Sequence, residues 1–238
     1  MSTFQIKIGL GADTIQILMS KANYLYALRS TSASNTDGSP TIWHVDNYFL
    51  STTEFSWTDE YLGFNSTSQI QENEIIIPFG QTPVDPGVVV TIDENGRLIV
   101  SEDGPENEIA FVNDGIEEYT VGLSASVQGA YIVSCAFPLV GYGMTTVIEP
   151  IQKVALMFSN KRLEVGSVVE KAMADGALID LTGATLATVS YSVDGGWVAV
   201  GDTKMTKFNA SEDLQSILIT PLTTTVSSTA NNLEKKQS

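Results

Sequence analysis

The stretch Val88-Val-Val-Thr-Ile-Asp-Glu-Asn-Gly-Arg-Leu-Ile-Val100 places two short apolar runs on either side of an Asn-Gly pair. Asn95 and Gly96 adopt positive φ values at little cost, and the tight turn of a β-hairpin requires such values. The stretch therefore predicts an antiparallel hairpin in which Val90 or Ile92 pairs with Leu98 or Ile99.

The same pattern extends along the chain in both directions. Apolar stretches of four to eight residues, rich in Val, Ile, Thr and aromatic residues, recur between clusters of Gly, Pro, Asn and Asp. A second hairpin is predicted where Asp194-Gly195-Gly196 separates two alternating stretches. About seventeen candidate strands result, and they predict an all-β fold of two β-sandwich-like domains with at most one or two short helices.

Two segments could be helical. Ser167-Val-Val-Glu170 matches a capping box and Gly176 could end a two-turn helix there, although the β-branched Val168 and Val169 suit an edge strand equally well. Apolar residues after Thr14 also follow helical spacing, but the residues just beyond them alternate as in a strand. For residues 14–19 a strand is therefore predicted.

A charged segment suggests where the chain divides. Residues 102–108 combine Gly104-Pro105 with a dense run of carboxylates, which is typical of a connection between domains. The predicted division is an acidic, aromatic-rich β domain at 1–115, an aliphatic β-sandwich domain at 116–222 and a flexible tail at 223–238, where apolar residues are scarce.

The net charge of −16 is concentrated in less than a third of the chain. Residues 46–118 hold sixteen of the twenty-eight carboxylates and one basic residue, Arg97. A field of one sign repels like charges and attracts cations or basic surfaces. The sequence thus argues against nucleic acid as a partner, because phosphate binding depends on lysine and arginine.

The composition also narrows the chemistry. With one histidine, His44, and one cysteine, Cys135, the chain offers no Cys/His zinc site and no intrachain disulfide. No nucleotide-binding glycine motif is present, so no cofactor is predicted. The first residues lack the features of a secretory signal and no apolar run of about 20 residues occurs, so we expect a cytoplasmic protein without a transmembrane segment.

Aromatic residues are dense between positions 43 and 64, beside short polar side chains. Aromatic faces next to carboxylates are typical of carbohydrate sites, where the ring stacks on the sugar and the carboxylates accept hydrogen bonds from its hydroxyls. The alternative is that Trp43, Phe55 and Trp57 are core residues of neighbouring strands. The predicted ligand-binding residues are Trp43, Asp46, Tyr48, Trp57, Asp59 and Tyr61, with Trp57 as the stacking platform.

Three function classes remain open. The leading expectation is a non-enzymatic binding protein whose ligand is a carbohydrate or another protein. The alternative is a structural or membrane-active β protein that forms homo-oligomers through an exposed sheet edge. An enzyme with paired carboxylates ranks third, since such pairs arise by chance among so many acidic residues. The acidic clusters could offer oxygen ligands to calcium, but a solvated acidic face explains them equally well.

Overall fold

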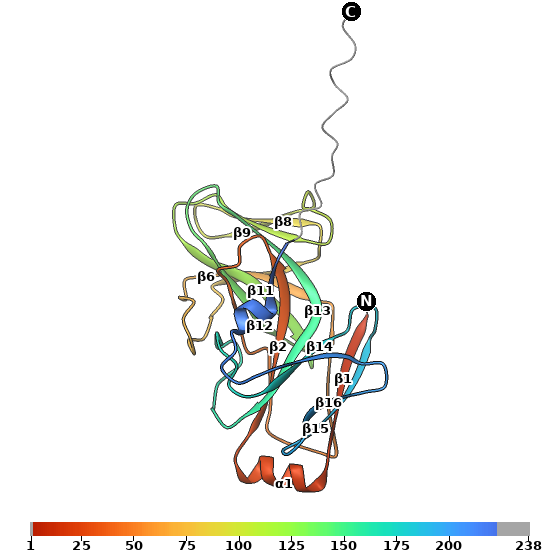
Figure 1. Cartoon of the computed structure of the whole chain (residues 1–238). Coiled ribbons are helices and arrows are strands. Elements are labelled where there is room, and N and C mark those ends of the chain that lie inside the picture. The colour runs from red at the N-terminus through yellow and green to blue at the C-terminus, as the bar shows by residue number, and fades with distance from the viewer. Residues whose placement is uncertain (1, 223–238) are drawn as a thin grey trace, which may run out of the picture.

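The computed structural model describes residues 2–222 and consists mainly of β-strands (Figure 1). Strands make up 54% of the described residues and helices 6%, which confirms the predicted all-β class. The strands form three sheets. The tail predicted at 223–238 lies outside the described residues.

The first sheet has four strands in the order β16-β15-β1-β5. In β1 the apolar residues Phe4, Ile6, Ile8 and Leu10 alternate with partly exposed ones, so one face of the strand is buried. β1 pairs in parallel with β15 and antiparallel with β5. The bounds are β1 Thr3–Leu10, β5 Thr52–Thr58, β15 Leu186–Ser192 and β16 Gly196–Val200.

The second sheet has nine strands, organised around the long strand β13. The first part of β13 pairs with β10 and the second part with β14, while β2 runs along its other edge. The register with β2 shifts between Pro150 and Val154, where β13 bulges. The bounds are β2 Tyr24–Ala33, β4 His44–Asp46, β8 Val88–Ile92, β9 Leu98–Ser101, β10 Ile109–Asn113, β13 Thr145–Ser159, β14 Gly176–Asp180, β17 Lys204–Phe208 and β18 Ile219–Pro221.

The third sheet has five strands in the order β3-β12-β11-β6-β7, and all of its pairs are antiparallel. The pair β11 and β12 is joined by the tight turn at Gln128 and Gly129, both of which have positive φ. The bounds are β3 Ser39–Pro40, β6 Tyr61–Ser66, β7 Gly80–Val84, β11 Tyr119–Val127 and β12 Ala130–Leu139.

Both predicted hairpins are confirmed. β8 pairs antiparallel with β9, with Ile92 opposite Leu98, and Gly96 has a φ of +75°. β15 and β16 pair in the same way across the Asp194-Gly195-Gly196 turn. The β8–β9 hairpin lies at one end of the molecule and α1 at the opposite end (Figure 1).

The structure settles the two segments that could be helical, and it corrects one of the predictions. Residues 12–20 form the helix α1 (Ala12–Ser20), in which Thr14 and Leu18 are buried, so the strand predicted at 14–19 is wrong. At 167–171, where the sequence allows either a helix or an edge strand, Ser167, Val168 and Lys171 form isolated β-bridges and no helix is present. The other helix within residues 2–222 is α2 (Leu214–Leu218), capped by the Asp213 side chain. In that range no helix is long and apolar enough to cross a membrane.

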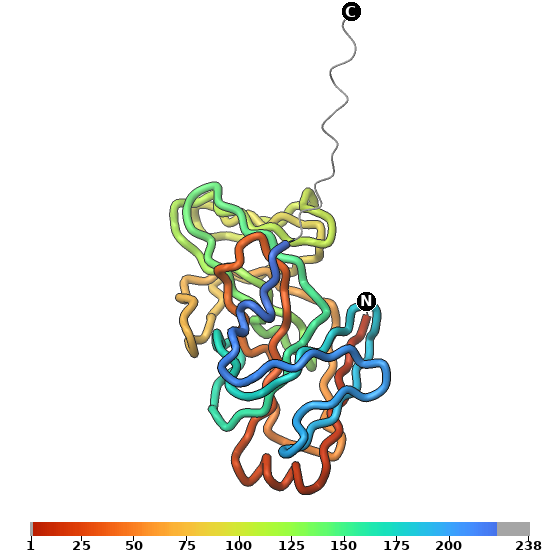
Figure 2. Tube along the Cα trace, in the orientation of Figure 1, coloured from red at the N-terminus to blue at the C-terminus, as the bar shows by residue number. Residues whose placement is uncertain are grey.

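The sheets do not follow the predicted division at residue 115. Each of the three contains strands from both sides of that position, and Figure 2 shows the red N-terminal strand lying beside blue strands from the last quarter of the chain. The largest hydrophobic cluster likewise combines residues from all three sheets, among them Ile6, Ile109 and Phe137. A boundary at 115 would therefore cut every sheet and this shared core.

Candidate functional site

Three of the six predicted ligand-binding residues are buried. Trp43, Trp57 and Tyr61 are only 0%, 2% and 6% exposed. Trp43 meets Trp57 edge to face with 5.3 Å between ring centroids, and Phe4 stacks on Trp57 at 5.6 Å. The expected stacking platform is therefore corrected: the Trp57 ring packs inside the protein, as aromatic side chains of neighbouring strands commonly do.

The guanidinium of Arg29, on β2, occupies the centre of these rings. Its Cζ atom lies 5.2 Å from the ring centroid of Trp43, 5.9 Å from that of Trp57 and 5.4 Å from that of Tyr61. The side chain is buried, and Nη2 donates to Tyr61 Oη and to Gln152 Oε1, both at 3.2 Å. Ring faces attract cations, so these three rings stabilise the buried guanidinium of Arg29.

Asp59, which is half-buried, also takes part in the hydrogen-bond network of Arg29, Tyr61 and Gln152. Its Oδ1 accepts a hydrogen bond from Tyr61 Oη at 3.0 Å and another from Gln152 Nε2. Burial raises the pKa of Tyr61 to about 12, so the phenol stays protonated and can donate. Trp43, Trp57 and Tyr61 thus lie together around Arg29, and Asp59 joins them through its hydrogen bond to Tyr61.

Asp46 and Tyr48 line a different feature, an open depression of about 340 Å³ on the surface. The Tyr48 ring is 66% exposed, and its backbone N–H donates to Asp46 Oδ1 at 2.9 Å. The next residue, Phe49, is buried and meets Phe158 edge to face at 5.4 Å. The core thereby anchors the loop on which Tyr48 points outward. The full lining is Asp46, Tyr48, Leu50, Thr52, Thr53 and Glu54.

The polar groups of this depression come from the loop and from the start of β5. The Glu54 side chain is half exposed and lies 3.9 Å from Lys7 Nζ, a long and exposed ion pair that contributes little to stability. Thr53 is buried, and its hydroxyl bonds to the backbone of Leu50. The depression, here called the Tyr48 depression, thus offers an exposed ring, two carboxylates and the Thr52 hydroxyl.

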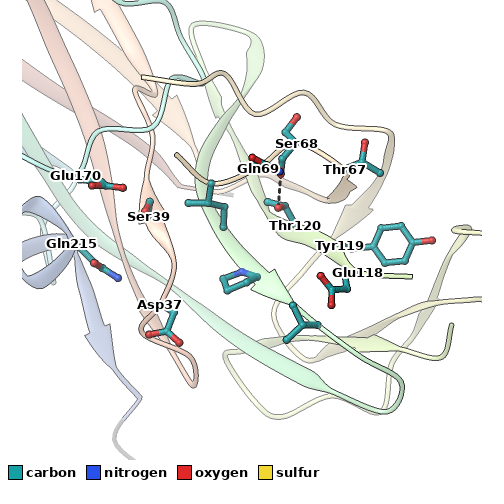
Figure 3. A pocket seen from close by; sticks show the side chains of 13 residues that line it. Asp37, Ser39, Thr67, Ser68, Gln69, Glu118, Tyr119, Thr120, Glu170 and Gln215 are labelled. Carbon is teal, nitrogen blue, oxygen red and sulfur yellow. Dashed lines mark hydrogen bonds between the residues drawn. The ribbon is translucent and has the colours of Figure 1, made fainter. Parts of the chain in front are cut away.

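A larger groove of about 510 Å³ opens elsewhere on the surface (Figure 3). Figure 3 shows Asp37, Ser39, Glu170 and Gln215 on one side of it and Thr67, Glu118 and Tyr119 on the other. Its lining contains three carboxylates and no lysine, arginine or histidine. We call it the acidic groove; its lining is Asp37, Ser39, Thr67, Ser68, Gln69, Ile70, Glu118, Tyr119, Thr120, Pro138, Val140, Glu170 and Gln215.

Hydrogen bonds hold the walls of the acidic groove. The buried Thr120 hydroxyl donates to the Ser68 carbonyl at 2.7 Å, which ties the loop after β6 to β11. Gln215 Nε2, on α2, donates to the Thr36 carbonyl at 2.5 Å and so connects the C-terminal helix to the loop before β3. Segments far apart in the sequence therefore meet at this groove.

The remaining candidate groups belong to the protein interior. His44 is buried and stacks on Phe55 with 4.7 Å between ring centroids, and burial lowers its pKa while Asp46 opposes that shift. Cys135 is fully enclosed and burial raises the pKa of its thiol, as expected for an unreactive core cysteine. Within residues 2–222, no three His, Cys, Asp or Glu side chains are arranged to hold a metal ion.

The acidic groove was not anticipated from the sequence. Its lining residues extend from position 37 to position 215, and no local motif connects them. The Tyr48 depression was partly anticipated, because Asp46 and Tyr48 are neighbours within the aromatic segment. The sequence does not indicate which of the consecutive apolar residues Tyr48, Phe49 and Leu50 is buried; in the structure it is Phe49 alone.

Comparisons of the chain with protein-family models, with curated proteins and with solved structures find no match.

Proposed function

We propose that this protein is a non-enzymatic carbohydrate-binding protein whose ligand contacts the Tyr48 depression. The observation that carries the proposal is the 66% exposed Tyr48 ring, held outward by the buried Phe49 beside the carboxylates of Asp46 and Glu54. An exposed aromatic ring contributes little to the core. It is available for stacking on the apolar face of a sugar ring.

The polar neighbours suit the same ligand class. Carboxylate oxygens accept hydrogen bonds from sugar hydroxyls, and a threonine hydroxyl can donate or accept. Asp46 Oδ1 already accepts the Tyr48 N–H, which fixes the carboxylate relative to the ring. This arrangement supports a shallow site that recognises one or two exposed sugar units.

A glycan array with matched tyrosine variants tests the proposal. Tyr48→Ala should abolish binding to the glycans that the native protein retains, and the melting temperature should remain unchanged because the ring is exposed. Tyr142→Ala is the control, since Tyr142 is 70% exposed but does not line the depression. An array on which the native protein binds no glycan, or on which both variants behave alike, would contradict the proposal.

A second candidate function is self-assembly through a sheet edge, and the strand β9 favours it. β9 is the last strand of its sheet, and Ile99 and Val100 are 55% and 39% exposed. Among the described residues, Leu98–Ser101 make backbone hydrogen bonds to β8 alone. An apolar edge strand of this kind is a template for pairing with another chain.

Light scattering distinguishes this candidate from a monomeric binding protein. If β9 mediates assembly, the native protein has at least twice the monomer mass and Ile99→Lys lowers it to that of one chain. Val198→Lys, on the edge strand β16, is the control and should leave the mass unchanged. A native protein with the mass of one chain would rule out assembly through β9.

A further inference from the structure

The acidic groove carries three carboxylates that have no partner of their own among residues 2–222. Asp37, Glu118 and Glu170 are exposed, and none takes part in the salt bridges formed within residues 2–222. Their carboxylate oxygens accept no hydrogen bond from that part of the chain either. Because the lining has no basic residue, the groove has a negative field that attracts cations.

The spacing of these carboxylates argues against a single metal ion as the cation. Calcium needs six to eight oxygen ligands at about 2.3 to 2.6 Å around one point. No group of three acidic side chains within the described part of the chain is close enough to form such a site. Asp37 and Glu170 lie on one side of the groove and Glu118 on the other (Figure 3). A ligand that meets all three must therefore carry separated positive charges.

Apolar groups complete the lining between the polar ones. Ile70 and Pro138 are half-buried, and Val140 is 48% exposed. Apolar surface of this kind gains free energy when it covers methylene groups. Tyr119, also half-buried, lines the groove while its ring packs against the core cluster.

We infer that the acidic groove binds a linear oligoamine, an aliphatic chain with ammonium groups at its ends and along its length. The ammonium groups pair with the separated carboxylates of Asp37, Glu118 and Glu170, and the methylene segments cover Ile70, Pro138 and Val140. The groove is large enough for such a chain, since its volume of about 510 Å³ lies in the range of small-molecule sites. This site is separate from the Tyr48 depression, with which it shares no lining residue.

Isothermal titration calorimetry with spermidine tests this inference, with butylamine as the single-ammonium comparison. Spermidine should bind with one site per chain, more tightly than butylamine and less tightly as salt increases. Glu118→Gln should weaken spermidine binding by about 1.5-fold to fivefold, which is the range that an exposed ion pair supplies. The combined variant Asp37→Asn, Glu118→Gln, Glu170→Gln should weaken it by at least about tenfold.

The matched control removes three charges from outside the groove. The combined variant Glu94→Gln, Glu102→Gln, Glu106→Gln changes the net charge equally at exposed positions that do not line the groove. It should reduce the affinity by less than about twofold. Equal weakening by both combined variants would overturn the inference, because the whole acidic surface would then be responsible. The absence of heat with spermidine, or saturable calcium binding that the groove variants abolish, would overturn it as well. If the combined groove variant does not fold, Glu118→Gln alone makes the same comparison with Glu106→Gln.

Discussion

Replacing Trp57 with alanine tests whether this side chain is a core residue or a surface on which a ligand stacks. The side chain is 2% exposed and stacks on Phe4 and Phe55 at 5.6 Å and 5.8 Å, while Trp43 meets it edge to face. Arg29 lies over its ring at 5.9 Å. Removing a buried tryptophan side chain costs about 3 to 5 kcal/mol, since apolar contacts are lost and a cavity remains. We therefore expect the free energy of unfolding of Trp57→Ala to fall by that amount.

The melting temperature should fall in proportion. A loss of 1 kcal/mol lowers it by about 2 to 4 °C in a chain of 150 to 250 residues, so Trp57→Ala should melt about 6 to 20 °C below the native protein. Urea unfolding followed by circular dichroism gives the free energy, and a thermal scan gives the temperature. Trp57→Phe should lose less than Trp57→Ala because a phenyl ring keeps part of the stacking.

Tyr48→Ala is the matched control for this experiment. Its ring is 66% exposed, so its removal should change the free energy of unfolding by no more than about 0.5 kcal/mol. Glycan binding should show the reverse order, with Tyr48→Ala losing it and folded Trp57→Phe keeping it. If Trp57→Ala were as stable as Tyr48→Ala, the placement of Trp57 in the core would be refuted.

Four further predictions follow from the same structure. Arg29→Ala should lower the free energy of unfolding by at least about 3 kcal/mol, because it removes two charge-assisted hydrogen bonds. Arg29→Met should recover part of this loss, because the methionine side chain refills the volume. Equal urea midpoints for the two variants would count against that account. His44 has a lowered pKa in the folded protein, so its contribution to stability is complete above the unfolded pKa of about 6.5 and is lost as the pH falls through the folded value. His44→Phe should therefore flatten the fall in urea midpoint below about pH 6.5, and parallel curves for the two proteins would contradict the assignment. Gly96→Val should lower the free energy of unfolding by about 1 to 2 kcal/mol, because Gly96 has a φ of +75° and an added Cβ would lie 3.0 Å from Tyr119 Oη. An unchanged urea midpoint would show that the turn tolerates a side chain. Gel-shift assays at physiological salt should detect no binding of DNA or RNA, because residues 46–118 offer only Arg97 as a cation, and a salt-sensitive shift would disprove this.

Local chemistry alone was enough to predict the hairpins and the fold class. The turn at Asn95 and Gly96 places Gly96 at a φ of +75°, which few other residues adopt, so its position is readable from a few letters of sequence. The alternation in Phe4, Ile6, Ile8 and Leu10 likewise identifies a strand with one buried face.

Where local signals compete, the prediction failed. The spacing of Ile15, Leu18 and Met19 fits a helix, whereas Tyr24 and Tyr26 alternate as in a strand. The structure has both, with α1 ending at Ser20 and β2 beginning at Tyr24. At 167–171 the capping-box pattern is present, but Val168 and Val169 are buried, Val168 is bridged to Thr41, and no helix forms. Burial of β-branched side chains outweighs the weak helical preference of so short a segment.

The partners of each strand and side chain depend on contacts between distant parts of the chain. Nothing near Arg29 in the sequence indicates that its guanidinium occupies the cluster of Trp43, Trp57 and Tyr61, because the pairing of β2, β5 and β6 with other strands brings these residues together. The boundary expected at residue 115 is not followed for the same reason, since strands from both halves pair in every sheet. Composition and short-range periodicity report on backbone conformation within a few residues, whereas the assembly of sheets, the core and the acidic groove depends on long-range packing.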